Sequence, residues 1–304
     1  MFGIKFFTFL VFVITLYGEP ITPLPLKVKV DVKKAELGKE LFFDSILSID
    51  NTVSCSTCHD LQNGGDDGLP HSFGVNGQEG DINAPTVYNA VYNFRQQWNG
   101  QAKDLKQQAY NPIQNPVEMG NNFKNLINTM NKTPYKEKFE TIYKDGVTKD
   151  NIADAIAEYE KTLTTPNSPF DRYLRGDKTA ITKKQKEGYE LFKSRGCIAC
   201  HHGINIGGNL YNKFGVVRNA KSKRLGRYEV TKKEIDKYYF KVPSLRNISM
   251  TAPYLHDGRF QTMDEVVKFM SLYQLGHFIT QDEVDKIVAF FHSLKGNIPQ
   301  SAKR

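Results

Sequence analysis

Hydrophobic residues recur at helical spacing in several segments of the chain, and long stretches without periodicity separate them. The pattern predicts helices over 32–43, 103–110, 123–130, 152–163, 183–192, 263–273 and 282–294, with Thr182 as the cap of the fifth. Residues 61–84 are rich in Gly and Asp, residues 203–248 are rich in Gly and basic side chains, and strand patterns are scarce. The sequence therefore predicts a mostly α fold with long loops and little β structure.

A polar, proline-bearing run at 164–169 divides the chain near its middle. The 304 residues suffice for about two domains of ordinary size. We predict a first domain over 19–164, a linker over 165–179 and a second domain over 180–304. Residues 1–18 place Lys5 before an apolar run at 6–17, which is typical of a signal peptide. Because Leu16 fits a small-residue cleavage site poorly, an uncleaved N-terminal anchor is the alternative.

Two copies of the pattern C-x-x-C-H, one in each half, use all four cysteines of the chain. They are Cys55-Ser56-Thr57-Cys58-His59 and Cys197-Ile198-Ala199-Cys200-His201. This spacing suits covalent c-type haem, in which two thiols bond the porphyrin and the next imidazole ligates the iron. A zinc site would bring its ligand pairs within about 12 to 20 residues, but 138 residues separate Cys58 from Cys197. A redox disulfide would leave the histidines unexplained. We predict two haem c groups, one in each domain.

Composition is ordinary for a soluble protein, with 39% hydrophobic and 24% charged residues, which argues against global disorder and a multi-span membrane protein. The net charge is +8, and residues 213–246 hold eleven Lys or Arg against three acids. This stretch is either a docking surface for an acidic partner or anionic lipid, or a solvated loop with a few cations that neutralise haem propionates. We favour the second interpretation and expect no nucleic-acid partner. Attachment of c-type haem outside the bacterial cytoplasm favours a periplasmic location.

The loops resemble those of a known family, the bacterial dihaem cytochrome c peroxidases, which also include the enzyme that matures a tryptophan-derived quinone. The resemblance covers nearly all of residues 32–295. The motifs that carry it are Asn83-Ala84-Pro85-Thr86, Trp98-Asn99-Gly100, Pro116-Val117-Glu118-Met119, Phe214-Gly215-Val216-Val217, Leu245-Arg246-Asn247, Thr251-Ala252-Pro253-Tyr254 and Gln274-Leu275-Gly276.

The resemblance implies an exported peroxidase that reduces hydrogen peroxide to water with electrons from a small donor, such as a monohaem cytochrome c or a copper protein. His59 would be the proximal ligand of the peroxidatic haem. His201 would hold the electron-transfer haem, with Met270 as its second axial ligand. Glu118 matches the catalytic acid of the family and Gln108 the amide beside it. From the residues alone Met270 would be core filler, and Met263 is a rival ligand.

The resemblance also implies a role for Trp98, the only tryptophan, as the indole between the two haems. Asn83, Thr251 and Pro253 match positions that bind a calcium ion, mostly through backbone oxygens. Family members are commonly homodimers, and this is expected of the chain only by resemblance. The pattern Trp98-Asn99-Gly100-Gln101 replaces the Trp-Asp-Gly-Arg common in the family.

One departure concerns the first haem. In family members with a closed peroxidatic site a histidine follows the Gly of a Ser-x-Gly turn, whereas Val75 follows Ser72-Phe73-Gly74 here. Since valine cannot ligate iron, we expect an open first site, with His71 as a more distant candidate ligand. Two alternatives stay open: a dihaem electron carrier without catalysis, and an enzyme that modifies a protein substrate. The second would have a tyrosine in place of Met270, and Tyr273 lies nearby.

Overall fold

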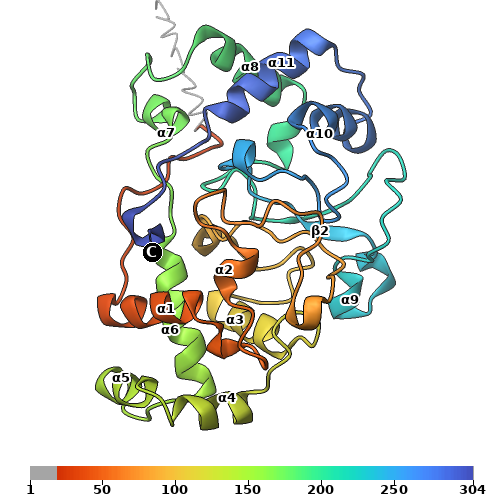
Figure 1. Cartoon of the computed structure of the whole chain (residues 1–304). Coiled ribbons are helices and arrows are strands. Elements are labelled where there is room, and N and C mark those ends of the chain that lie inside the picture. The colour runs from red at the N-terminus through yellow and green to blue at the C-terminus, as the bar shows by residue number, and fades with distance from the viewer. Residues whose placement is uncertain (1–18, 304) are drawn as a thin grey trace, which may run out of the picture.

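The computed structural model describes residues 19–303 (Figure 1). The predicted signal peptide, residues 1–18, lies outside the described residues. The described chain is mostly helical with a single pair of three-residue strands, which confirms the predicted helical class. None of the helices in residues 19–303 is both long and apolar enough to cross a membrane.

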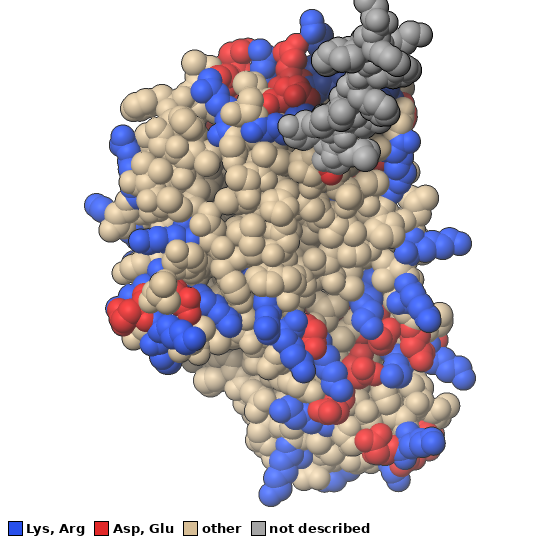
Figure 2. All heavy atoms as spheres, turned by 180° about the vertical axis from the view of Figure 1, so that it is seen from behind, with Lys and Arg blue, Asp and Glu red and all other residues tan. Residues whose placement is uncertain are grey.

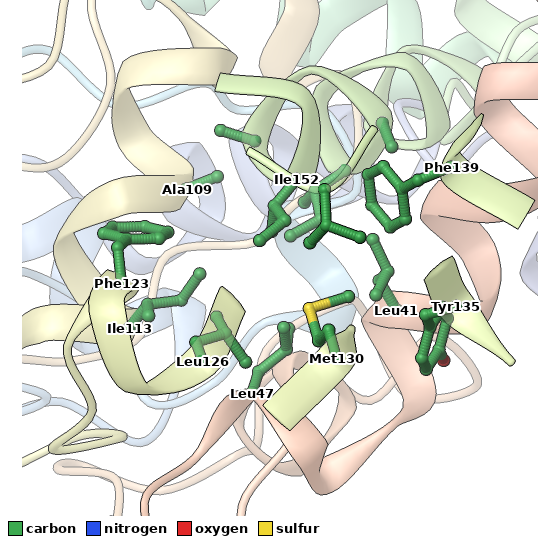
Figure 3. Close-up of a cluster of buried hydrophobic side chains, with 14 of the residues drawn as sticks. Leu41, Leu47, Ala109, Ile113, Phe123, Leu126, Met130, Tyr135, Phe139 and Ile152 are labelled. Atoms are coloured by element: carbon green, nitrogen blue, oxygen red, sulfur yellow. The ribbon is translucent and has the colours of Figure 1, made fainter. Parts of the chain in front are cut away.

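The first half contains five helices around one core: α1 (Val32–Phe43), α3 (Leu105–Gln114), α4 (Phe123–Met130), α5 (Tyr135–Ile142) and α6 (Lys149–Thr162). A single turn, α2 (Cys55–Cys58), carries the first C-x-x-C-H motif. Asp31, Asn122 and Thr148 accept hydrogen bonds from backbone N–H groups of the first turn and so begin α1, α4 and α6. Leu41, Phe139 and Ile152 from three of these helices meet in the core drawn in Figure 3.

The second half is built from α7 (Pro169–Leu174), α8 (Lys183–Ser194), α9 (Tyr228–Thr231), α10 (Met263–Phe269) and α11 (Gln281–His292). A π-helical turn, Met270–Gln274, continues α10. Strands β1 (Tyr211–Lys213) and β2 (Tyr239–Lys241) pair antiparallel. Short 3-10 turns lie at Ser45–Leu47, Val75–Gly77, Ala90–Tyr92, Cys197–Ala199, Glu234–Asp236, Ile248–Met250 and Gln300–Ala302. Phe170, Tyr189, Phe192 and Phe290 form an aromatic core between α7, α8 and α11.

The helix before each C-x-x-C-H motif crosses a later helix at a glycine. A methyl group added at Gly38 of α1 would lie 1.8 Å from the carbonyl oxygen of Ala155 in α6. A methyl group at Gly188 of α8 would lie 1.9 Å from the carbonyl oxygen of Lys286 in α11. Because only a hydrogen fits between the backbones, both pairs approach unusually closely. The two halves thus use the same device to set the helix that leads toward a haem motif.

The two ends of the described chain cross to the opposite half. Ile21 is buried in the core of the second half, and Leu24 N–H donates to Asp171 of α7 at 3.1 Å. At the other end Ala302 packs in a cluster with Phe42 and Tyr159, and the Tyr159 hydroxyl donates to the Ser301 carbonyl at 3.0 Å. The C-terminus accordingly lies beside α6 (Figure 1).

The predicted helices are all present, with ends shifted by a few residues, and four further helices, α2, α5, α7 and α9, were not predicted. The stretch predicted as a linker, 165–179, contains α7, in which Pro169 occupies the first turn and Ser168 and Asp171 form a capping box. Proline is well suited to the first helical position because that residue needs no N–H donor. Pro169 therefore begins a short helix within the stretch predicted as a linker.

Four of the eleven basic side chains of residues 213–246 have a hydrogen-bond or ion-pair partner: Arg224, Arg227, Lys237 and Arg246, the last of which binds Asp171. Arg224 binds Asp81 and Glu229, and Lys237 binds Glu234. Arg227 donates to the carbonyl oxygen of Gly100 at 2.8 Å. On the face shown in Figure 2, blue and red side chains lie intermixed around a broad uncharged area, so that face carries no continuous basic patch.

Candidate haem-binding and active sites

Each C-x-x-C-H motif lines its own cavity. The first cavity, about 60 Å³, is lined by Cys55, Cys58 and His59 together with Gln108 and Glu118. The second cavity, about 220 Å³, is lined by both thiols and the imidazole of the other motif and, from distant parts of the chain, by Trp98 and Met270. Each cavity therefore presents two thiols and one imidazole on one short segment, which is the donor set that haem c requires.

The four thiols are free, so neither motif forms a disulfide. Burial raises the pKa of Cys58 and of Cys197 to about 11, which keeps both thiols protonated. In the described part of the chain no cluster of His, Cys, Asp or Glu could hold a metal ion. Among the described residues neither motif shows a disulfide or a zinc-type ligand cluster.

Both motif histidines are oriented by a backbone carbonyl. His59 Nδ1 lies 3.0 Å from the carbonyl oxygen of Gly65, and His201 Nδ1 lies 3.4 Å from that of Ile206. Burial lowers the pKa of both imidazoles, to about 4 for His201, so both stay neutral. With Nδ1 engaged as a donor, Nε2 keeps its lone pair for a metal. Gly207, at φ 123°, makes room here, because a Cβ would lie 2.1 Å from the Pro243 carbonyl.

Met270 faces the second cavity and its two rivals do not. Met270 begins the π-helical turn, which projects its side chain among the cavity-lining residues. Met263 instead packs against the aromatic core of the second half. Tyr273 stacks on Phe269 with ring centroids 4.3 Å apart and does not line the cavity. Of the three candidates, Met270 alone shares a cavity with His201.

Glu118 is held at the first cavity by a turn that follows α3. The Asn115 side-chain amide donates to Glu118 Oε1 at 2.6 Å, and Oε2 has no hydrogen-bond partner among residues 19–303. Burial raises the pKa of Glu118 above its ordinary value, while the Asn115 hydrogen bond opposes that shift. The Gln108 side chain lines the same cavity and makes no side-chain hydrogen bond within the described residues. A carboxyl group with a raised pKa and a free amide thus lie beside one haem motif.

Val75 and His71 both lie outside the first cavity. Val75 is buried in the core of the first half, and its N–H donates to the Glu118 carbonyl at 2.8 Å. This hydrogen bond ties the Ser72-Phe73-Gly74 turn to the Glu118 segment. His71 Nδ1 lies 3.1 Å from Glu79 Oε1, so the imidazole is engaged elsewhere. In this structure no histidine other than His59 lines the first cavity.

Glu160 of α6 is a site residue that the sequence pattern did not single out. Its side chain is 5% exposed, lines the first cavity and has one oxygen, Oε2, buried without a partner. Burial raises its pKa to about 8. The one sequence signal that could have identified Glu160 is a charged residue on the otherwise apolar, buried face of a periodic helix.

Trp98 and the three predicted calcium positions lie together in the wall of the second cavity. Trp98 Nε1–H donates to the Asn83 carbonyl at 2.9 Å. The Asn83 amide donates to the carbonyl oxygens of Pro253 at 2.6 Å and Leu255 at 3.0 Å. Asn83 Oδ1 is buried without a partner, as is Asp66 Oδ1 in the same wall. Orphaned buried oxygens are rare and fit a site that a cation completes.

Known proteins are similar to this chain over most of its length. A family model described as di-haem cytochrome c peroxidase matches residues 32–179. The cytochrome c peroxidase Ccp of Escherichia coli K12 is 47% identical over 286 residues, covering 92% of this chain and 62% of the relative, so the chain spans less than two thirds of that protein. The cytochrome c551 peroxidase of Nitrosomonas europaea is 46% identical, covering 93% of this chain and 86% of the relative.

Among solved structures, a MauG-like protein associated with microbial copper homeostasis superposes with a TM-score of 0.78 at 23% identity, covering 94% of this chain and 96% of the other. At that identity the likeness shows the fold. The sequence relatives show more, since their names confirm the predicted family and enzyme class. The chain belongs to the di-haem cytochrome c peroxidases.

Proposed function

We propose that this chain is an exported dihaem peroxidase that reduces hydrogen peroxide at the first cavity and takes up electrons at the second. The observation that carries the proposal is that Glu118 and Gln108 share a cavity with Cys55, Cys58 and His59. Haem c, when bound, supplies the iron that binds peroxide in the first cavity and a second iron that stores an electron. In each turnover one peroxide, two electrons and two protons become two waters.

Glu118 moves the proton between the two oxygens of peroxide. Its free Oε2 accepts the proton of the inner oxygen and returns it to the outer oxygen, which leaves as water. Asn115 keeps the carboxyl group in place through its 2.6 Å hydrogen bond. The raised pKa of Glu118 brings its two protonation states closer in energy near neutral pH, as this exchange requires. Gln108 orients peroxide with its unused amide.

Electrons enter at the second cavity. His201 and Met270, which line this cavity, would hold the second haem, and a His/Met pair would give it a raised reduction potential, which suits a site that accepts an electron from a donor and holds it. Trp98 is well placed to assist transfer, because it comes from the first half of the chain and lines the second cavity. The donor is a small redox protein, a monohaem cytochrome c or a copper protein. Each C-x-x-C-H motif belongs to one haem c domain, with limits near 19–164 and 180–304.

The first site is proposed to be open without prior reduction. Val75 is buried in the core and His71 is engaged by Glu79, so neither competes with peroxide. Oxidised holoprotein should accordingly show a five-coordinate or water-bound first haem. A low-spin, bis-histidine spectrum of the first haem would exclude this part of the proposal.

A calcium ion is proposed between the two halves, bound by Asn83 and by backbone oxygens of Thr251 and Pro253. All three residues line the second cavity, and the orphaned oxygen of Asn83 supports the assignment. Rotating the Asn83 amide by 180° would turn Oδ1 toward the Pro253 carbonyl and make the group a cation ligand.

Location in the periplasm is part of the proposal, with an anchored form if residues 1–18 are retained, as is assembly into a homodimer. Nucleic acid is no partner in this proposal. The location is testable by fractionation of expressing cells, and the dimer by light scattering of purified holoprotein.

One experiment separates the proposal from its alternatives. Holoprotein reduced by a small cytochrome is mixed with peroxide, and turnover is compared between wild type and Glu118→Gln. A peroxidase turns over peroxide only when Glu118 is present. An electron carrier without catalysis is instead oxidised slowly by peroxide, at the same rate in wild type and in Glu118→Gln. An enzyme that modifies a protein substrate would carry tyrosine at the second iron. A Met–iron absorption band that is present in wild type and lost in Met270→Gln would therefore argue against this alternative.

A further inference from the structure

Lys241, the last residue of β2, has a buried side chain without a partner. It is 5% exposed, and it makes no side-chain hydrogen bond or ion pair within the described residues. Its setting lowers the pKa of the ammonium to about 8 through burial alone. Charged side chains are almost never buried without a partner, because removing an ammonium from water is costly. An unpaired lysine in this position therefore indicates a missing anion.

The second cavity is where that anion belongs. Lys241 lines it, together with Cys197, His201 and Met270. Two other cations line this cavity, but Arg195 is engaged by Glu283 and Lys213 is exposed. Asp66, a carboxyl group in the same wall, forms no ion pair with Lys241 and owes its raised pKa mainly to burial. The described chain thus supplies a cation at this cavity and no anion for it.

Backbone hydrogen bonds hold Lys241 rigidly. Its N–H donates to the Trp98 carbonyl at 2.8 Å, and it pairs with Tyr211 in the β1–β2 ladder. Its position is therefore tied to the same tryptophan that lines the second cavity. A charge held on a strand and a second hydrogen bond is preorganised to meet a ligand.

We propose that Lys241 is the carboxylate-binding residue of the second cavity and that it pairs with a propionate of the haem bound there. A cation beside a haem that gains an electron stabilises the reduced form. Lys241 therefore raises the reduction potential of the second haem in addition to anchoring it. This assignment rests on the proposed function, since it requires a haem in the second cavity.

The test is a spectroelectrochemical titration of holoprotein that reads the midpoint potential of the methionine-ligated haem. Lys241→Met should shift the reduction equilibrium against the reduced form at least tenfold, about 59 mV for a one-electron couple. Lys241→Arg keeps the positive charge, so its reduction equilibrium constant should stay within threefold of the wild-type value. Lys213→Met is the matched control, because this lysine lines the same cavity but is exposed, so solvent screens its charge.

If the reduction equilibrium constant of Lys241→Met stays within threefold of wild type while haem content and the Met–iron band are unchanged, the assignment is overturned. If Lys241→Met does not fold, the holoprotein crystal structure decides: Nζ within about 4 Å of a haem carboxylate supports the pairing, and Nζ bound elsewhere excludes it. A haem assay on wild type separates the two proposals. Fewer than two haems per chain overturns both, whereas two haems and an unaffected potential overturn only the role of Lys241.

Discussion

The crossing of α1 and α6 at Gly38 leads to a stability prediction for Gly38→Ala. The added methyl carbon would lie 1.8 Å from the Ala155 carbonyl oxygen and 3.0 Å from Tyr159 Cβ. Ordinary contact begins near 3.4 Å, so the helices would have to separate by about 1.6 Å. Since the clash is with backbone, no side-chain rotation can relieve it.

The magnitude follows from two opposing effects. Forced backbone shifts in a packed core cost about 1–3 kcal/mol, and a displacement beyond 1 Å places this crossing above that range, at about 4 kcal/mol. Alanine gains about 1 kcal/mol over glycine through its helix propensity. We therefore expect Gly38→Ala to lower the free energy of unfolding by about 3 kcal/mol.

Urea unfolding of the holoprotein, followed by far-UV circular dichroism, measures this loss. Gly188→Ala should cost a similar amount, because its methyl group would meet the Lys286 carbonyl at 1.9 Å. Gly80→Ala is the control: its backbone is not left-handed and its nearest contact would be 3.5 Å. A Gly38→Ala protein as stable as the Gly80→Ala protein would refute the close helix crossing.

Further outcomes are expected at the two cavities. Glu118→Gln should lower kcat/KM for peroxide about 100- to 10,000-fold with haem content unchanged, since it removes the proton carrier. Met270→Gln should lower the potential of the second haem and remove its Met–iron band, as potentiometry with absorption spectra would show. Burial raises the pKa of Glu160 from 4.5 to about 8, so between these pH values the folded chain holds a proton that the unfolded chain releases. The free energy of unfolding should therefore fall by up to about 1.4 kcal/mol for each unit that the pH rises across this window. Urea unfolding of Glu160→Gln should show no such decline. A calcium chelator should lower the melting temperature of wild type by several degrees and leave Asn83→Ala unaffected.

Periodicity predicted the long helices well because each buries one face, and that face repeats along the sequence. Short α7 escaped prediction because its signal is a cap and a proline rather than a hydrophobic stripe. The two C-x-x-C-H motifs could be recognised from the sequence alone, because their haem-binding residues are adjacent in the chain.

Residues that depend on tertiary placement could not be assigned from the sequence. Met263 and Met270 lie on one amphipathic segment, and the π-helical turn is what directs Met270 to the second cavity. Glu160 and Lys241 read as ordinary charged residues, because their burial comes from segments distant in the chain. Composition and residue spacing do not indicate which distant segments will bury a given side chain.

The exchange of the two chain ends has a consequence for synthesis on the ribosome. Ile21 emerges early, yet its core partners, among them Phe170 and Phe290, emerge much later. The first half, in turn, lacks Ala302 until the whole second half has been made. Domains usually fold as they emerge, the N-terminal one first. Here the first half is not complete before residue 302 appears, and the second half needs Ile21 from the start of the described chain. Expression of either half alone should therefore yield an unfinished unit, and mixing the two fragments should restore what each lacks.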